Sequence, residues 1–85
     1  MIDCVITLKK IIDKLYQQQV DVQLTRPDPK FGDFATNAAL QLAKPLGKNP
    51  REIAEAIAEE LRGRQEFSEV SVAGPGFINM KLSDQ

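Results

Sequence analysis

The first clear pattern in the chain is an apolar stripe at helical spacing. Its members are Val5, Leu8, Ile11, Ile12 and Leu15. The polar residues between them are Lys9, Lys10, Asp13 and Lys14. Apolar positions three or four residues apart lie on one side of an α-helix, so this segment predicts an amphipathic helix from about Asp3 to Gln18.

A strand is predicted next, because apolar and polar residues alternate from Val20 to Arg26. The apolar positions are Val20, Val22 and Leu24, and the polar positions are Asp21, Gln23 and Thr25. Alternation of this kind is typical of a strand with one buried face. Pro27 and Pro29 end the strand, since proline lacks the amide hydrogen that strand pairing needs.

Residues 30–37 combine a glycine, two phenylalanines and three side chains of the helix-capping type. We expect a short extended piece that leads into a second helix, with Asp33 or Thr36 as its N-cap. The apolar residues at helical spacing that follow are Ala38, Ala39, Leu40, Leu42, Ala43 and Leu46. Gly47 is placed to end this helix at its C′ position.

A third helix is predicted to begin at Asn49. Asparagine is a favoured N-cap, Pro50 suits the first helical position, and Glu52 stands where a capping box places its acid. The buried stripe of this helix comprises Ala54, Ile57, Ala58 and Leu61, with Ile53 beside them. Gly63 supplies the stop.

Two strands joined by a glycine-containing turn complete the pattern. Apolar and polar residues alternate from Phe67 to Ala73, and Gly74 and Gly76 flank a proline in the turn before a strand that begins at Phe77. The predicted order is helix, strand, short strand, two helices and two strands. Helices on one face of a small antiparallel sheet suit that order, so we expect an α+β two-layer sandwich in a single domain, residues 1–85.

The last strand has two faces of different character. Strand side chains alternate, so one face should carry Ile78, Met80 and Leu82, and the other Phe77, Asn79 and Lys81. The first set is typical of a core. The second set offers an aromatic surface, an amide that donates and accepts hydrogen bonds, and a cation. Together these groups suit an unstacked nucleotide and its phosphate.

A purely structural interpretation of the same residues is open. Aromatic side chains are enriched in strands and often pack against a cross-strand neighbour, so Phe77 can be explained without RNA. Asn79 argues against that explanation, since asparagine is depleted in strand interiors. A solvated position at the edge of the sheet would account for Asn79 equally well.

The composition is ordinary for a small globular domain. The 85 residues are 42% hydrophobic and 27% charged, which is too apolar for disorder, and the short chain leaves little room for a deep catalytic cleft. With 11 basic and 12 acidic residues, net charge cannot attract a polyanion, so any RNA contact has to be local. Cys4 is the sole cysteine, which excludes an internal disulfide and fits the reducing cytoplasm.

Several kinds of chemistry lack the residues to perform them. The chain has no histidine and one cysteine, which removes zinc-type metal sites and every mechanism that needs an imidazole base. No stretch approaches the ~20 apolar residues of a membrane span, and neither glycine-rich phosphate-loop motif occurs. A stand-alone enzyme is a poor interpretation, because no set of nucleophile, base and metal can be assembled.

Six further residues have a structural explanation as turn or cap residues. They are Gly32, Asp33, Asn37, Asn49, Gly74 and Gly76. Glycine permits unusual backbone angles, and Asp and Asn side chains cap helices or bond locally; a direct RNA role for Asp33 and Asn37 stays open. Lys44, Lys48 and Arg51 lie close together around the junction of the second and third helices, where they could contact phosphate or simply solvate the surface.

Three blocks of the chain have a distinctive sequence. They are residues 31–37 (FGDFATN), residues 39–47 (ALQLAKPLG) followed by Asn49-Pro50-Arg51, and residues 72–79 (VAGPGFIN). In this order they resemble the N-terminal additional domain of arginyl-tRNA synthetase, over about Lys30 to Leu82. The outer two blocks are specific and the middle one is supportive. The resemblance implies an α-β-β-α-β-β core, in agreement with the pattern of apolar residues.

The resemblance also implies an RNA contact. In that family the domain docks on the corner of the tRNA at the D-loop, where an aromatic and an amide two residues apart on the last strand meet a base. Phe77 and Asn79 match those positions. The family often has a tyrosine where this chain has Phe77, so stacking is kept and a hydroxyl hydrogen bond is lost. The expected phosphate contacts are Lys81 and, as further candidates, Lys44, Lys48 and Arg51.

The family's enzymes join arginine to tRNA with ATP and magnesium in a separate class I catalytic domain. Its HIGH and KMSK signatures do not occur in these residues. We therefore expect a non-catalytic part of a longer cytoplasmic enzyme, without a cofactor of its own. Its partners would be arginine tRNA and the catalytic domain of the same chain, with neither DNA nor a membrane involved.

A competing hypothesis is an interdomain or protein-protein docking module. In that case the face with Phe77 packs on protein, and RNA contact is incidental. RNA binding falls steeply with added salt, whereas apolar docking barely changes, so salt dependence separates the two hypotheses.

Overall fold

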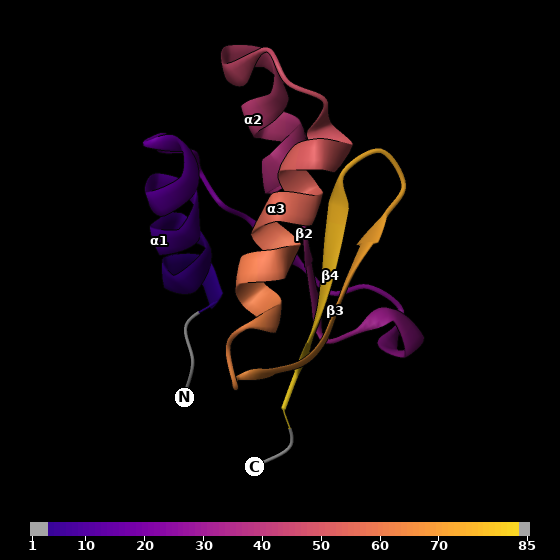
Figure 1. The fold of residues 1–85 in the computed structure, drawn as a ribbon. Helices are drawn as coiled ribbons and strands as arrows, with labels where there is room; N and C mark the ends of the chain where they lie inside the picture. Colours follow the sequence, from indigo (N-terminus) through magenta and orange to yellow (C-terminus); the bar gives the residue numbers. More distant parts are fainter. Residues whose placement is uncertain (1–3, 84–85) are drawn as a thin grey trace.

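The computed structural model describes residues 4–83, apart from the side chain at position 29. Its elements are α1 (Cys4–Tyr16), β1 (Leu24–Thr25), the 3-10 turn η1 (Pro29–Phe31), β2 (Phe34–Thr36), α2 (Ala38–Leu46), α3 (Pro50–Arg62), β3 (Phe67–Ala73) and β4 (Phe77–Leu82). Figure 1 shows them in two layers, with the helices on one side and the strands on the other.

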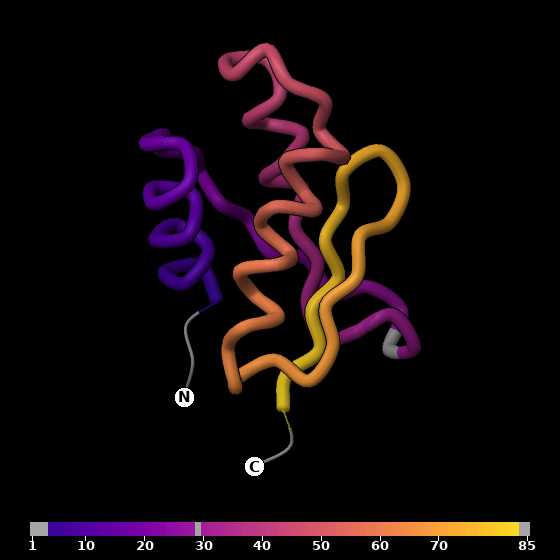
Figure 2. Tube along the Cα trace, in the orientation of Figure 1, coloured from indigo at the N-terminus to yellow at the C-terminus, as the bar shows by residue number. Residues whose placement is uncertain are grey.

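The strands form one antiparallel sheet in the order β1-β2-β4-β3. β4 is an inner strand, because β2 pairs with one of its edges and β3 with the other. The chain trace in Figure 2 shows that the helices cover one side of this sheet. The predicted α+β two-layer sandwich is confirmed.

The core lies between the helices and one face of the sheet. Ile78 and Met80 of β4 point into it and have no exposed surface, which confirms the predicted alternation of this strand. The largest fully buried side chains are Leu8, Ile11, Ile12, Leu42, Ile53, Ile57, Leu61, Ile78, Met80 and Thr36. All except Thr36 belong to the apolar patterns of the sequence.

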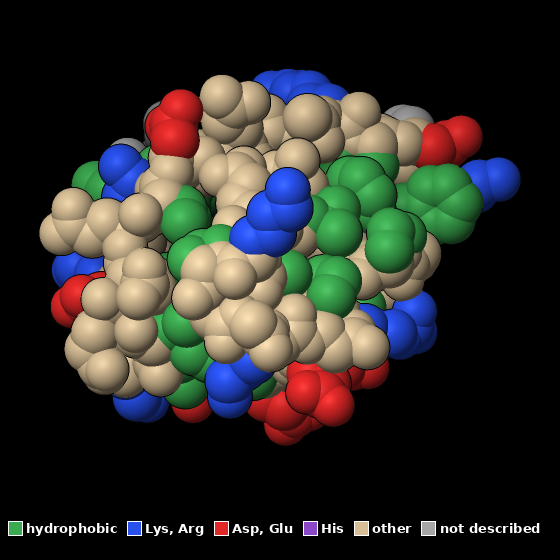
Figure 3. Space-filling model, turned by 90° about the horizontal axis from the view of Figure 1, so that it is seen from above, with side chains coloured by type: hydrophobic (Ala, Val, Ile, Leu, Met, Phe, Trp, Pro, Cys, Tyr) green, Lys and Arg blue, Asp and Glu red, His purple; other side chains and the backbone are tan. Residues whose placement is uncertain are grey.

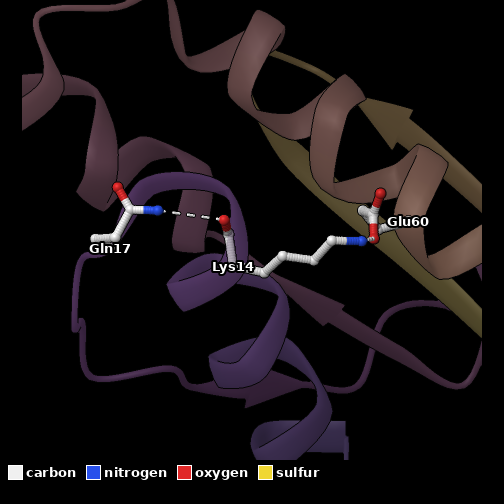
Figure 4. Close-up of polar contacts among 3 residues, drawn as sticks. All are labelled: Lys14, Gln17 and Glu60. Atoms are coloured by element: carbon white, nitrogen blue, oxygen red, sulfur yellow. Dashed lines mark hydrogen bonds and ion pairs between the residues drawn. The ribbon is translucent and has the colours of Figure 1, made fainter.

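Helix α1 is attached to α3 by its apolar stripe and by one ion pair. Lys14 Nζ lies 2.7 Å from Glu60 Oε1, and Gln17 Nε2 donates to the Lys14 carbonyl at 3.3 Å (Figure 4). The Lys14 side chain is 66% exposed, so the pair adds little stability and apolar packing dominates. The helix ends at Tyr16 rather than the predicted Gln18, because Gln17 takes a φ of +52°. The predicted start, Asp3, lies outside the described residues.

The strand predicted from Val20 to Arg26 is much shorter in the structure. Only Leu24 and Thr25 pair with β2. In this register the partner of Val22 would be Ala38, which is the first residue of α2 and presents no strand edge. Val22 is nevertheless buried. The alternation therefore indicated burial correctly but not strand pairing.

The start of α2 also differs from the prediction. Its N-cap position is Asn37 rather than Asp33 or Thr36, and the Asn37 side chain does not cap the helix but accepts a hydrogen bond from Gln41 Nε2 at 3.0 Å. The Thr36 hydroxyl accepts from the Ala38 amide at 3.2 Å. Thr36 thus satisfies one free amide at the helix start without being the cap residue.

The remaining helix ends agree with the sequence. Gly47 closes α2 in the left-handed conformation, with φ +62°. Asn49 caps α3, where its Oδ1 accepts from the Arg51 amide at 2.8 Å and Pro50 opens the first turn. Gly63 follows the last residue of α3 as its C-cap. These three helix ends were therefore predicted correctly from the single capping residue at each of them.

Gly32 and Asp33 fasten the chain before β2 to β4. Gly32 has φ +137°, and a side-chain carbon there would stand 2.7 Å from the Met80 carbonyl oxygen, so only glycine lets the chain pass this close. The Asp33 amide donates to that same carbonyl at 2.8 Å, and Asp33 Oδ2 accepts from the Leu82 amide at 2.8 Å. Asp33 therefore completes the end of β4 instead of capping α2.

Replacing Gly32 by alanine should destabilise the chain more than the same change at Gly47. Both glycines have positive φ, but a Cβ at position 47 meets nothing within 4 Å, whereas one at position 32 meets the Met80 backbone. We expect Gly47→Ala to cost about 1 kcal/mol and Gly32→Ala about 3 kcal/mol or more. Urea unfolding followed by circular dichroism measures both. Equal losses would show that the close approach at Gly32 does not matter.

Candidate nucleic-acid interface

Within residues 4–83, no helix covers the second face of the sheet (Figure 1). Its central row crosses all four strands and consists of Thr25, Ala35, Asn79 and Ser71. Phe77 and Ala73 form a neighbouring pair on one side of that row, and Lys81 and Glu69 form a pair on the other. We call this set of residues the open face.

Phe77 is the aromatic group of the open face. Its side chain is 42% exposed and is not among the apolar residues that pack on the core. Ring atom Cδ2 lies 3.7 Å from the point that a side-chain carbon on Gly74 would occupy, so the ring stands beside the turn between β3 and β4. The position agrees with the predicted alternation, and it leaves ring surface available for contact with a planar group.

Asn79 lies in the middle of the open face. The sequence allowed a solvated edge position as its explanation, and that is wrong, since β4 is an inner strand and Asn79 is only 9% exposed. No group among residues 4–83 forms a hydrogen bond with its carboxamide. In the same residues, every side-chain nitrogen or oxygen that is fully buried has a hydrogen-bond partner, so the unpartnered Asn79 carboxamide is not fully buried. The Asn79 carboxamide is therefore narrowly exposed to solvent and free to donate and accept.

Lys81 provides the cation of the open face. It lies opposite Glu69 on β3, yet the ion pairs within residues 4–83 are Lys14–Glu60 and Arg62–Glu59, so the Lys81 ammonium is unpaired. A shallow hollow of about 480 Å³ lies beside it. The hollow is lined by Arg26, Asp33, Phe34, Lys81, Leu82 and Ser83. A second cation, Arg26, therefore borders the same hollow, which sequence patterns did not indicate.

The turn before Phe77 is held by helix α3. Arg51 Nη1 donates to the Gly74 carbonyl at 2.7 Å. A side-chain carbon on Gly76 would stand 3.1 Å from Pro50 Cβ and 3.4 Å from Leu40 Cγ, so only glycine fits easily between the turn and the helices. Arg51 thus has a structural partner, and its phosphate contact stays a prediction.

Two further candidate cations, Lys44 and Lys48, belong to the helix layer. Lys48 Nζ is 5.9 Å from the centre of the Tyr16 ring, at the end of α1 and therefore on the helix side of the molecule. Burial, and secondarily the Glu52 carboxylate, raises the pKa of Tyr16 above its usual 10.0, so the ring stays neutral beside Lys48. Lys44 is exposed in the last turn of α2. The structure does not bring these two lysines together with the open face.

Apolar side chains gather on the side of the molecule where the β3–β4 turn lies, as Figure 3 shows from above. Among residues 4–83, the exposed large hydrophobic residues are Ile6, Phe31 and Phe77. Phe31 was part of a distinctive sequence block but was not predicted as a contact residue. The only available signal was a phenylalanine outside any apolar periodicity, between a lysine and a glycine.

Neither a metal centre nor a membrane helix competes with this interpretation in the described part of the chain. Residues 4–83 contain no cluster of three acidic, cysteine or histidine ligands, and none of their helices is long and apolar enough to cross a bilayer. A hollow of about 570 Å³ between α1 and residues 18–21 is lined by Lys9, Asp13 and Asp21 among others. It shares no lining residue with the open face.

Comparison with known proteins identifies the family. The fold is that of a small α+β domain in which no helix of residues 4–83 covers the second face of the sheet. The family model described as "Arginyl tRNA synthetase N terminal domain" matches residues 6–82. The chain therefore belongs to the family of arginyl-tRNA synthetase N-terminal domains.

Individual relatives agree with that assignment. An arginine–tRNA ligase of Thermotoga petrophila is 43% identical over 79 residues, which is 92% of this chain and 14% of the relative. One of Sinorhizobium medicae is 54% identical over 66 residues, 78% of this chain and 11% of the relative. The chain thus spans a small part of the relatives it matches.

Two solved structures have the same fold. Arginyl-tRNA synthetase from Plasmodium falciparum superposes with a TM-score of 0.79 at 26% identity, over 94% of this chain and 15% of that one. The Thermus thermophilus arginyl-tRNA synthetase gives a TM-score of 0.75 at 25% identity, over 94% of this chain and 13% of that one. The fold is therefore shared at low sequence identity.

Replacing Asn79 by alanine should leave the stability of the chain nearly unchanged. Its carboxamide has no protein partner among residues 4–83, so no hydrogen bond is lost, and we expect a change within about 0.5 kcal/mol. Thr36→Val is the matched control, because the buried Thr36 hydroxyl accepts from the Ala38 amide and its loss should cost about 1 kcal/mol. Urea unfolding compares them. A larger loss for Asn79→Ala would make Asn79 a structural residue.

Proposed function

We propose that this chain is the tRNA-recognition part of an arginyl-tRNA synthetase, and that its open face binds the D-loop of arginine tRNA. The observation that supports this most directly is the combination of an exposed aromatic ring with an unpartnered carboxamide two residues away on a rigid inner strand. A strand with a purely structural role needs neither feature, because an exposed ring and an unpartnered carboxamide both stabilise the fold less than buried apolar side chains do.

The spacing of the two side chains suits one flipped base. Side chains at i and i+2 on a strand lie roughly 7 Å apart. A base stacked on the Phe77 ring therefore extends its hydrogen-bonding edge toward the Asn79 carboxamide, which can donate to one base atom and accept from another. Ala35 and Ser71, the cross-strand neighbours of Asn79, have small side chains. Stacking supplies affinity, and the carboxamide supplies base preference.

Phosphate contacts come from the cations near the same strand. The Lys81 ammonium is unpaired among residues 4–83, and Arg26 borders the hollow beside it. The chain as a whole has 11 basic and 12 acidic residues, so these local charges have to act at short range. Lys44, Lys48 and Arg51 remain weaker candidates, since Arg51 holds the turn and Lys48 faces Tyr16.

In the longer protein, the domain supports the ATP-dependent attachment of arginine to tRNA. The relatives are named arginine–tRNA ligases, and this chain corresponds to about a seventh of the Thermotoga petrophila enzyme. ATP and magnesium act in a catalytic domain elsewhere in that longer protein, which works in the cytoplasm. The role of the present residues is to hold the corner of the tRNA while the catalytic domain acts on its end.

Phe77→Ala should weaken binding of arginine tRNA by roughly tenfold, since a stacked base is worth ~1 to 3 kcal/mol. The measurement is an amide chemical-shift titration of the labelled chain, carried to millimolar concentration because one or two base contacts bind weakly without the other domains. The shifts should cluster on residues 76–81 and shrink when the D-loop base is substituted. Added salt should weaken them.

Ile6→Ala is the control for this experiment, since Ile6 is another exposed apolar residue and lies on α1. It should leave binding unchanged. Loss of fold on Phe77→Ala, with tRNA affinity following only the folded fraction, would make the ring a core residue. Shifts that are scattered over lysines and indifferent to the base would favour docking of the open face on protein instead.

A further inference from the structure

Phe31 is the most exposed large hydrophobic residue of the described chain, at 54%. It does not belong to the core cluster or to the apolar residues packed against that cluster. Exposing a phenylalanine forgoes the stabilisation that its burial would give. The exposure of Phe31 therefore needs an explanation, and a contact with another molecule would provide one.

The backbone holds Phe31 in a fixed position. The Phe31 amide donates to the Asp28 carbonyl at 2.8 Å and closes the turn η1, while the Lys30 amide donates to Asp28 Oδ1 at 3.3 Å. The next residues, Gly32 and Asp33, are fastened to the backbone of β4. An aromatic ring on such a support loses little entropy when it binds, which is typical of a recognition residue and not of a loose loop.

The turn η1 lies on the same side of the sheet as Phe77. It contacts β4, and in Figures 1 and 2 the purple segment around it projects from the sheet on the side away from the helices. Gly32, the residue after Phe31, meets Met80, so it lies roughly 10 Å from Phe77 along the strand direction. A short run of unstacked nucleotides spans such a gap.

The charges around Phe31 favour an anionic partner. Lys30 Nζ lies 5.2 Å from the Phe31 ring centre. Arg26 contacts a different ring, that of Phe34, which packs against the core. The two acids of the segment already accept backbone hydrogen bonds, Asp28 from Lys30 and Asp33 from Leu82. Lys30 lacks an ion pair among residues 4–83. Aromatic rings beside free cations are the pattern of single-stranded RNA contacts.

We propose that Phe31 is a second stacking platform for RNA, which binds a loop nucleotide close to the one stacked on Phe77, with Lys30 on its phosphate. This inference rests on the proposed function, since it extends the same RNA surface from β4 to η1. Two rings on one rigid frame fix the direction of the RNA strand across the sheet, which a single ring cannot do.

The test uses Phe31→Trp, because the chain contains no tryptophan and the new indole becomes its only such fluorophore. Arginine tRNA made by transcription is titrated into the 85-residue chain. Stacking of a base on the indole should quench its emission by roughly half or more. The quenching should follow the same binding curve as the amide shifts of β4 and fall with added salt. Ile6→Trp is the matched control, and it also corrects for light absorbed by the tRNA.

A second variant, Phe31→Ala, measures affinity. The exposed ring lies outside the core, so the fold should persist, and binding of arginine tRNA should weaken roughly fivefold. Phe31→Ala combined with Phe77→Ala should bind more weakly than either single variant. The amide spectrum of each variant confirms that it is folded.

The outcomes separate this inference from the proposed function. Amide shifts on β4 without quenching at position 31, or quenching equal to the Ile6→Trp control, would overturn the role of Phe31 and leave the Phe77 site intact; η1 would then be a surface for protein. Quenching at position 31 with unchanged affinity in Phe77→Ala would overturn the β4 site and leave Phe31 as the contact. If neither amide shifts nor quenching is observed at millimolar concentration, both the Phe77 site and the role of Phe31 are overturned.

Discussion

The hydrogen bonding of β4 along both of its edges is the constraint on which the rest of the domain depends. On one edge it pairs with β2, where Gly32 and Asp33 continue the contact beyond the last paired residue. On the other edge it pairs with β3 over the whole hairpin. Ile78 and Met80 then have to face the helices, and Phe77 and Asn79 have to face the other way. A slip of one residue would exchange the core and the recognition surface.

The same arrangement explains why a polar side chain is tolerated at the centre of a sheet. Asn79 is only 9% exposed and has no hydrogen-bond partner among residues 4–83, yet its polar atoms are not fully buried, so the cost to folding is small. Under the proposed function, the gain is a carboxamide whose position is fixed by an inner strand before RNA binds. Pre-organised groups lose less entropy on binding, so a domain with few contacts can still discriminate between bases.

The charges available to the open face are a few nearby cations and not the net charge of the chain. The chain is close to neutral, and most of its basic residues lie away from the open face or have partners, such as Lys14 with Glu60 and Arg51 with Gly74. Binding that depends on a few free cations and one or two rings is weak in isolation. Under the proposed function, such binding becomes useful when other domains of a longer protein hold the same tRNA, because the local concentration of RNA is then high.

The sequence by itself determined the elements that depend on neighbours in the chain. Apolar periodicity placed the three helices, β3 and the two faces of β4, and single residues such as Asn49 and Gly47 marked helix ends. Only the tertiary structure decided that residues 20–23 remain unpaired, that Asp33 bonds Leu82 across 49 positions, and that Asn79 lies on an inner strand. The physical reason is that periodicity reports burial, whereas strand order and pairing depend on residues far apart in the chain, which no local pattern records.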